Sequence, residues 1–163
     1  MRILNLVGPE MGPVLKSHYP EAEIHDEPDG GEYHQIFSLY ELSRLPIQEV
    51  VGRLKTLAGM LALMGRLFIV ENSAEWFARK VEIDGITDVV TNTAIYGIPE
   101  RPFRSIYTLL TLRRLIDEVG LSVAEAGEEP YTIVKTLDDK QILGRRLRIV
   151  AVKMKEGGKH VWS

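Results

Sequence analysis

A short stretch near the amino terminus carries the residue types that could hold a ligand. The apolar run Ile3-Leu4-Asn5-Leu6-Val7 is followed by Gly8-Pro9-Glu10-Met11-Gly12. The run is too continuous for a strand with one solvated face, so it predicts a buried, parallel strand. A glycine turn after such a strand lets a ligand approach the backbone, and a helix after it presents free N–H groups. The spacing G-x-x-x-G also fits a turn without a ligand, so both interpretations stay open.

An acidic side chain at the end of the next expected strand is the second candidate. Residues Ala22 to His25 predict a short strand, which ends at Asp26 and Glu27 before a Pro-Asp-Gly-Gly turn. A carboxylate in this position can accept two hydrogen bonds from the hydroxyls of a ribose. Seven acids lie between Glu10 and Glu32, so an ordinary polar loop is the alternative.

Other chemistry lacks its usual sequence patterns. The four histidines, at positions 18, 25, 34 and 160, have no metal-ligand spacing, and the chain has no cysteine. We therefore expect no metal site and no disulfide. The chain also lacks the G-x-S-x-G and G-x-x-x-x-G-K-[ST] motifs of serine hydrolases and P-loop NTPases. No residue can be assigned a catalytic role from these patterns.

The middle of the chain contains the surest helix. Tyr33 to Leu39 predicts a third strand, and Pro46 then precedes a helical pattern. The residues expected on the buried face are Ile47, Val50, Val51, Leu54, Leu57, Ala58 and Leu61. We expect Gly65 to end this helix and Arg66 to Val70 to form another buried strand. Strand, helix and strand in this order predict a right-handed crossover in a parallel sheet.

The second half of the chain predicts two further helices. Ser73 is expected to cap a short helix, and Thr108 to open a longer one that Gly120 stops. Between them, residues 83–102 predict an irregular excursion, with a short strand at Asp88 to Thr91.

A strand-rich region follows these helices. The strand patterns are Leu121 to Ala126, Tyr131 to Leu137 and Leu147 to Met154, with breaks expected at 127–130 and 138–139. They predict a terminal antiparallel hairpin. We expect the last strand to insert antiparallel beside the Arg66 strand, in the spatial order second, first, third, fourth strand, then hairpin.

Length and composition indicate one globular domain, expected over residues 1–155, with a flexible tail at 156–163. The chain has 163 residues, 45% of them hydrophobic, and a net charge of −3. No apolar run could span a bilayer and no signal-peptide pattern is present, so we expect a cytoplasmic protein with no membrane contact. Residues 101–163 hold 12 Lys and Arg against 8 Asp and Glu. Their strands and helices need charged outer faces in any case, which favours a solvated surface over nucleic-acid binding.

Taken together, residues 1–155 resemble the S-adenosylmethionine-dependent methyltransferases of the Rossmann-like class. Tyr33 to Leu42 is similar to the family's fourth strand and the segment after it. Gly59 to Val70, with its Gly-Arg-Leu pattern, and Arg104 to Val123 are similar to the family's next strand and its last helix. The resemblance implies an α/β fold with an open, mostly parallel sheet, helices on both faces and a carboxyl-terminal antiparallel hairpin.

The resemblance also implies a cofactor site for S-adenosylmethionine. The implied cofactor-binding residues are Gly8, Pro9, Glu10 and Gly12 near the methionine part, Asp26 or Glu27 on the ribose, and Ser38, Leu39 and Tyr40 beside the methyl group. Asn5 stands where the family has an acid, Val7 where it has the first glycine, and Pro9 where a small residue is usual. Only residues 27–32 separate Asp26 from Tyr33, where the family has helices and a strand, so one edge of the sheet is expected to be missing.

Two functions follow from this resemblance. The first is a reduced methyltransferase that acts on an unidentified substrate, since methyl transfer needs mainly positioning. The second is a non-catalytic scaffold or assembly subunit that keeps the fold, because fold does not imply function. An exposed sheet edge beside the missing strand would favour a homo- or hetero-oligomer.

Overall fold

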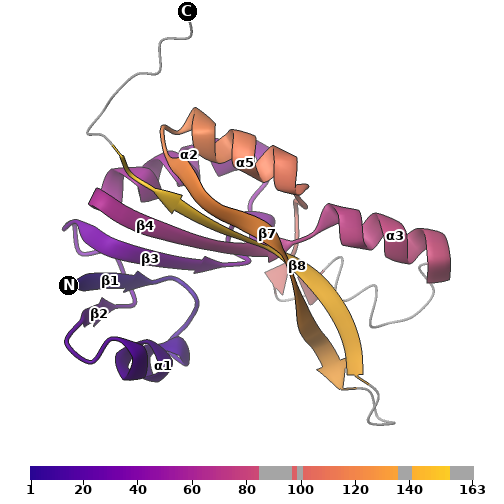
Figure 1. The fold of residues 1–163 in the computed structure, drawn as a ribbon, viewed down its shortest axis with the longest axis horizontal. Helices are drawn as coiled ribbons and strands as arrows, with labels where there is room; N and C mark the ends of the chain where they lie inside the picture. Colours follow the sequence, from indigo (N-terminus) through magenta and orange to yellow (C-terminus); the bar gives the residue numbers. More distant parts are fainter. Residues whose placement is uncertain (85–96, 99–100, 136–140, 155–163) are drawn as a thin grey trace, which may run out of the picture.

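The computed structural model describes residues 1–84, 97–98, 101–135 and 141–154. Its main feature is a six-stranded sheet in the order β2-β1-β3-β4-β8-β7. The strands are β1 (Arg2–Asn5), β2 (Glu23–His25), β3 (Tyr33–Leu39), β4 (Leu61–Asn72), β7 (Ser122–Lys135) and β8 (Gln141–Val152). The first four are parallel, and β8 lies antiparallel between β4 and β7. The predicted fold class, strand order and open edge at β2 are confirmed (Figure 1).

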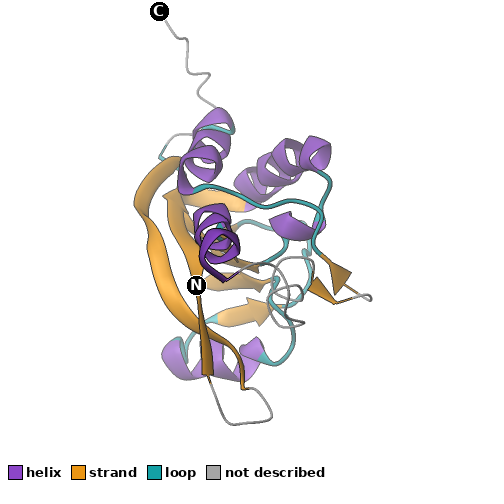
Figure 2. Ribbon diagram, turned by 90° about the vertical axis from the view of Figure 1, so that its right-hand side faces the viewer, coloured by secondary structure: helices purple, strands orange, loops and turns teal. Residues whose placement is uncertain are grey.

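Helices cover both faces of this sheet (Figure 2). They are α1 (Met11–His18), the short 3₁₀ helix η1 (Leu42–Arg44), α2 (Ile47–Met60), α3 (Ala74–Asp84) and α5 (Leu109–Glu118). Helix α1 packs on one face, whereas α2 and α5 pack on the other. Two further short strands, β5 (Gly97–Ile98) and β6 (Arg101–Pro102), pair only with each other.

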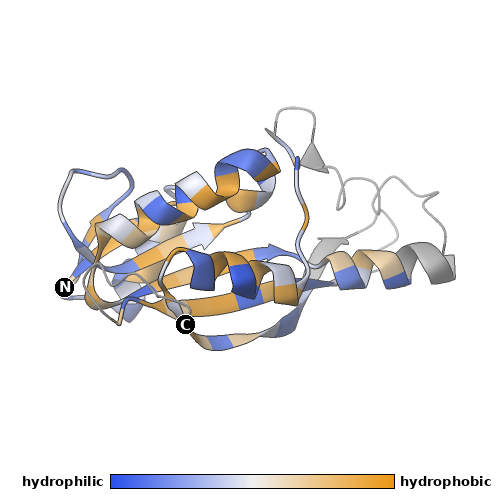
Figure 3. Cartoon of the chain, turned by 90° about the horizontal axis from the view of Figure 1, so that it is seen from above, coloured by the Kyte–Doolittle hydropathy of each residue, from blue (hydrophilic) through white to orange (hydrophobic). Residues whose placement is uncertain are grey.

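The alternation of side chains along β1 explains the two layers. Ile3 packs with Leu15 of α1, while its neighbour Leu4 belongs to the larger core under α2 and α5. Successive side chains of a strand point to opposite faces, so one apolar run supplies both cores. Leu54 of α2 and Leu112 of α5 are fully buried in the larger core. Figure 3 shows the apolar residues along the strands that these two helices cover.

The helix α2 ends earlier than the sequence predicts. Its last residue is Met60, Leu61 is already extended, and β4 begins there instead of at Arg66. Gly65 lies inside β4, where an added Cβ would stand 2.7 Å from the carbonyl oxygen of Ala62 and 3.0 Å from that of Tyr33. The prediction of Gly65 as a helix cap is therefore wrong, since this glycine permits a close backbone approach at an irregular point of the β3–β4 ladder. Ile47, expected inward, is exposed at the start of the helix.

The predicted break at residues 127–130 is also wrong. Strand β7 runs without interruption from Ser122 to Lys135, with Pro130 opposite Arg145 of β8. Because β7 is the edge strand, a proline can be accommodated without the loss of a ladder hydrogen bond on its outer side. The expected strand at 88–91, the expected break at 138–139 and the expected tail at 156–163 lie outside the described residues.

The predicted starts of two helices are confirmed by their hydrogen bonds. The Oγ atom of Ser73 accepts from the backbone N–H of Trp76 at 3.1 Å, before α3. The Oγ1 atom of Thr108 accepts from the N–H of Thr111 at 3.0 Å, at the start of α5. Side-chain caps of this kind satisfy N–H groups that have no partner within the helix.

Candidate functional site

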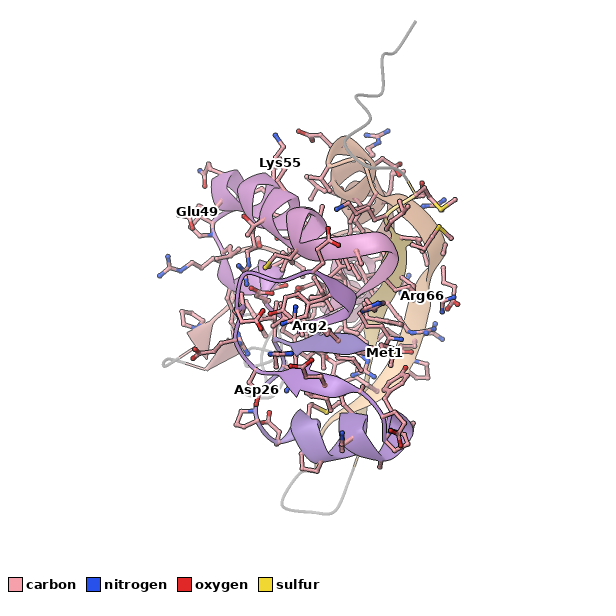
Figure 4. All side chains as sticks on the ribbon, turned by 90° about the vertical axis from the view of Figure 1, so that its left-hand side faces the viewer. Met1, Arg2, Asp26, Glu49, Lys55 and Arg66 are labelled. Carbon is pink, nitrogen blue, oxygen red and sulfur yellow. The ribbon has the colours of Figure 1, made fainter. Side chains whose placement is uncertain are left out.

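Most of the predicted site residues lie together at the carboxyl ends of β1, β2 and β3. The Gly8 turn follows β1, Asp26 follows β2, and Tyr40 follows β3. Parallel strands end on the same side, and open α/β sheets bind ligands there. The arrowheads of these strands point the same way in Figure 1, and Figure 4 labels Asp26 at the end of β2.

A buried amide joins the glycine turn to the acid. Asn5, the last residue of β1, is 1% exposed. Its Nδ2 donates to the carbonyl oxygen of Gly8 at 2.8 Å and to Oδ1 of Asp26 at 2.6 Å. Its Oδ1 accepts from the N–H of Val7 at 3.2 Å. The turn and the acid, which the sequence places as separate candidates, are therefore parts of one hydrogen-bonded unit.

The Gly8 turn runs directly into α1. The N–H of Met11 donates to the carbonyl oxygen of Gly8 at 3.1 Å, and that of Gly12 to the carbonyl oxygen of Pro9 at 3.1 Å. Gly8 has φ +146°, a conformation that favours glycine. An added Cβ there would stand 2.6 Å from the carboxylate oxygens of Glu10, whereas one at Gly12 would meet nothing within 4 Å. The space in front of Gly8 thus holds the exposed, movable carboxylate of Glu10.

The end of β3 is held by a different set of contacts. Ser38 is fully buried, and its hydroxyl donates to Oε2 of Glu41 at 3.0 Å. Glu41 in turn accepts from Nε of Arg53 on α2 at 2.6 Å. Leu39 is the last paired residue of the strand, opposite Val70. The Ser38 side chain therefore supports the loop that follows β3.

Tyr40 has an unusual backbone conformation at this position. Its φ of 53° lies in the left-handed region, which bulky residues adopt only when the surroundings enforce it. The Tyr40 ring lies 6.0 Å from that of Phe103. Burial raises the pKa of the Tyr40 phenol, although a hydrogen bond with Arg146 of β8 acts in the opposite direction. Backbone strain of this kind is concentrated at functional sites.

Arg146 and Tyr131 extend this group of side chains onto the hairpin. The guanidinium of Arg146 lies 5.5 Å from the ring centroid of Tyr131, and its Nε donates to Glu129 at 2.7 Å. Burial also raises the pKa of the Tyr131 phenol. No pattern in the sequence indicates this group, because it depends on the register of β7 against β8 and on the place of β8 beside β4.

A buried carboxyl positions the segment after Tyr40. Glu71, near the end of β4, is fully buried and accepts hydrogen bonds from the N–H of Leu42 at 2.9 Å and of Ser43 at 3.2 Å. The hydroxyl of Ser43 donates to the same carboxyl. Burial raises the pKa of Glu71 to about 7, although these hydrogen bonds act against the rise. An acid directly after the apolar run Leu67 to Val70 is a sequence signal that could have found it.

The short connection from β2 to β3 has its own polar anchor. The hydroxyl of Tyr33 donates to Oδ1 of Asp29 at 2.7 Å, and Arg2 forms an ion pair with the same carboxylate. Hydrogen bonds from Tyr33, then from Arg2, hold the pKa of Asp29 well below its usual range. The guanidinium of Arg2 also lies 4.9 Å from the centroid of the Tyr33 ring. These contacts hold residues 26–32, which join β2 to β3. Parallel strands are more often joined by a crossover helix.

Metal ligands and membrane spans are absent from the part of the chain that the structure describes. No group of three or more His, Cys, Asp or Glu residues there could hold a metal ion. No helix among the described residues has the length and apolar character to cross a membrane.

Comparisons with solved structures identify the fold. A methyltransferase from Methanosarcina mazei, described as S-adenosylmethionine-dependent, matches with a TM-score of 0.53 at 13% identity, over 95% of this chain and 93% of its own. A chain of the complex described as that between the Haloferax volcanii Trm112 methyltransferase activator and "the putative methyltransferase" matches with a TM-score of 0.62 at 12% identity, over 96% of this chain and 83% of its own. The chain has the fold of the S-adenosylmethionine-dependent methyltransferases. No protein-family model and no curated protein matches the sequence.

A third structure with this methyltransferase fold contains both a substrate and the spent cofactor. It is the Burkholderia thailandensis 1,6-didemethyltoxoflavin-N1-methyltransferase, with bound 1,6-didemethyltoxoflavin and S-adenosylhomocysteine. Its TM-score is 0.54 at 13% identity, over 94% of this chain and 61% of that one. At such identities the likeness concerns the fold alone.

Proposed function

We propose that the protein is a reduced S-adenosylmethionine-dependent methyltransferase whose cofactor lies across the Gly8 turn and Asp26. The observation that carries this proposal is the Asn5 amide, which holds the turn and the acid together at the carboxyl end of β1. The fold supports it, since the neighbours named above are methyltransferases.

The residues of the unit fit parts of the cofactor. Within the described residues only Oδ1 of Asp26 has a hydrogen-bond donor, so Oδ2 can accept from a ribose hydroxyl. Glu10 brings a carboxylate to the turn, which suits the ammonium group of the methionine part. Pro9 and Gly12 would line the same turn. The bound cofactor would supply a methyl group carried on a sulfonium sulfur, for transfer to a nucleophilic acceptor.

The acceptor would lie beside Leu39 and Tyr40. Tyr40 forms a hydrogen bond with Arg146 and its ring lies 6.0 Å from that of Phe103, while Glu71 holds the backbone that follows. These groups would orient the acceptor, which is the main requirement of an in-line displacement. No catalytic acid or base is assigned.

The missing edge limits the expected affinity. Residues 26–32 connect β2 to β3, and within the described residues no strand lies beyond β2 to enclose an adenine. We expect a dissociation constant of micromolar order or weaker, corresponding to roughly −8 kcal/mol at best.

Calorimetric titration with S-adenosylmethionine and S-adenosylhomocysteine tests the proposal. The informative variant is Asp26→Asn, because its side-chain oxygen can still accept from Asn5 while the charge is lost. Loss of a charge-assisted hydrogen bond of about 1.5 to 3 kcal/mol should weaken binding by about tenfold to a hundredfold. Gln48→Ala, on the exposed side of α2, is the matched control and should bind as the wild type does. Undetectable binding of both cofactor forms at millimolar concentration to the folded wild type would refute the proposal.

A non-catalytic scaffold is the second candidate function, and the open edge at β2 favours it. The outer side of Glu23–His25 pairs with no strand in the described residues, and an unpaired edge can accept a strand of another chain. The Haloferax volcanii neighbour comes from a complex with an activator protein, which supports a hetero-oligomer as the form to test. A scaffold should sediment together with copurifying partners, and it should not bind the cofactor.

A further inference from the structure

Asn5 uses its whole amide within the protein. Both ends of the side chain are engaged, Nδ2 toward Gly8 and Asp26 and Oδ1 toward the N–H of Val7. The residue is buried, so water does not replace these partners. A buried polar group that loses its partner costs more free energy than the hydrogen bond contributes.

Only a donor can stand between these two acceptors. The carbonyl oxygen of Gly8 and the carboxylate of Asp26 both present lone pairs to Nδ2, at 2.8 and 2.6 Å. An aspartate at position 5 has nearly the same shape but would bring a second carboxylate against that of Asp26. Two carboxylates at this distance cannot both be ionised without strong repulsion. The neutral amide at position 5 and the acid at position 26 are therefore complementary choices.

We propose that Asn5 is a positioning residue for the cofactor site, which holds the carboxylate of Asp26 at a fixed place relative to the Gly8 turn. The inference rests on the proposed function above and deepens it. It also gives a physical reason why position 5 carries an amide where the methyltransferase family typically has an acid. In this chain the negative charge lies on Asp26, which follows the neighbouring strand β2.

Other ionisable side chains surround this junction. His25, directly before Asp26, lies 3.2 Å from Glu23 and 3.5 Å from Asp29. Glu10 places its carboxylate over Gly8, Glu27 follows Asp26, and Lys16 of α1 donates to the carbonyl oxygen of Ala22 ahead of β2. None of them donates to Asp26 in the described residues, so Asn5 supplies the bond that orients this carboxylate.

The test compares the wild type, Asn5→Asp and the double variant Asn5→Asp/Asp26→Asn. Titration with S-adenosylmethionine is carried out from about pH 5 to about pH 8, a range that spans the loss of a shared carboxyl proton. Thermal unfolding without cofactor is measured over the same range. Asn5→Asp should bind at least about tenfold more weakly than the wild type at the highest pH. That loss should shrink as the pH falls, because one proton shared by the two carboxyls restores a hydrogen bond.

The double variant shows whether the pair acts as a unit. It exchanges the amide and the acid, so a donor again faces an acceptor across the pair and the repulsion between the two carboxylates disappears. The carbonyl oxygen of Gly8 still lacks the donor that Asn5 supplies in the wild type. We expect the double variant to recover part of the melting temperature that Asn5→Asp loses at high pH, while cofactor binding stays weak because the acid has moved. A site in which position 5 has only a packing role would show a loss without pH dependence and no recovery in the double variant, and this result would overturn the inference.

Failure of the proposed function has a different outcome. If the wild type binds no cofactor, the unfolding measurements still show whether Asn5 and Asp26 are coupled, since they need no ligand. Coupling without cofactor binding refutes the enzyme and the positioning role together, whereas binding without coupling refutes the positioning role alone.

Discussion

Replacing Glu71 by glutamine should remove a pH dependence of stability that one buried carboxyl creates. Burial raises the pKa of Glu71 from its ordinary 4.5 to about 7 in the folded protein. Between these values the folded protein keeps a proton that the unfolded chain has released, so the free energy of unfolding falls as the pH rises. One pKa unit corresponds to about 1.36 kcal/mol, so the rise corresponds to about 3 kcal/mol over this interval.

Glutamine should keep much of the local geometry. Its oxygen can accept from the N–H of Leu42, and its amide can donate to the hydroxyl of Ser43. The N–H of Ser43, which donates to the same oxygen of Glu71 as that hydroxyl, loses its acceptor, and this loss is the same at every pH. The variant does not titrate at this position. The wild type should therefore lose about 3 kcal/mol relative to Glu71→Gln between about pH 4.5 and about pH 8.

Urea denaturation of both proteins at a series of pH values measures this difference. Taking the difference cancels the contribution of other titrating groups, because they are common to both proteins. Asp29, whose pKa is lowered, contributes stability that is lost only as the pH falls further. Parallel stability curves for the wild type and the variant would refute the reasoning, and would mean that the Glu71 carboxyl is ionised in the folded protein at all these pH values.

Two further predictions concern packing. Leu54→Ala should lower the free energy of unfolding by about 2 to 5 kcal/mol, because removal of the fully buried side chain leaves a cavity. Denaturant melts measure this loss against that of the exposed Gln48→Ala. Equal effects of the two substitutions would show that the buried face of α2 is assigned wrongly. Gly65→Ala should cost about 1 to 3 kcal/mol, since its Cβ would meet backbone oxygens of Ala62 and Tyr33 that cannot move independently. Gly59→Ala, in α2 with nothing within 4 Å of the added Cβ, should instead stabilise by about 0.5 to 1 kcal/mol, and a loss at both glycines would contradict the argument.

The strand order could be predicted because it depends on local patterns. A strand, an amphipathic helix and a strand predict a parallel crossover, and a terminal hairpin predicts the antiparallel pair. Element boundaries were less accessible. The helix α2 ends at Met60 without a glycine at its cap, where Leu61 stands, and Pro130 continues a strand because β7 lies at the edge. Neither fact can be derived from local sequence, since each depends on which strand lies alongside.

The candidate site shows the same division. The Gly8 turn and Asp26 stand out in the sequence by residue type and by their positions after strands. Their connection through Asn5 does not stand out, because it requires β1 and β2 to pair in the register that the structure shows. Glu71 contacts Ser43, 28 residues away along the chain. Arg146 contacts Tyr40, which follows β3, and Glu129 of β7. The roles of both residues therefore depend on tertiary structure.

The position of β8 has a consequence for how the protein is made. This strand fills the gap between β4 and β7, and its residues Leu147, Ile149 and Ala151 are fully buried in the main core. During synthesis, β4 emerges from the ribosome about 80 residues before its neighbour, and until then one side of its backbone is unpaired. The nascent chain therefore exposes an apolar strand edge for several seconds at ordinary elongation rates, which is the period in which it would benefit most from a chaperone.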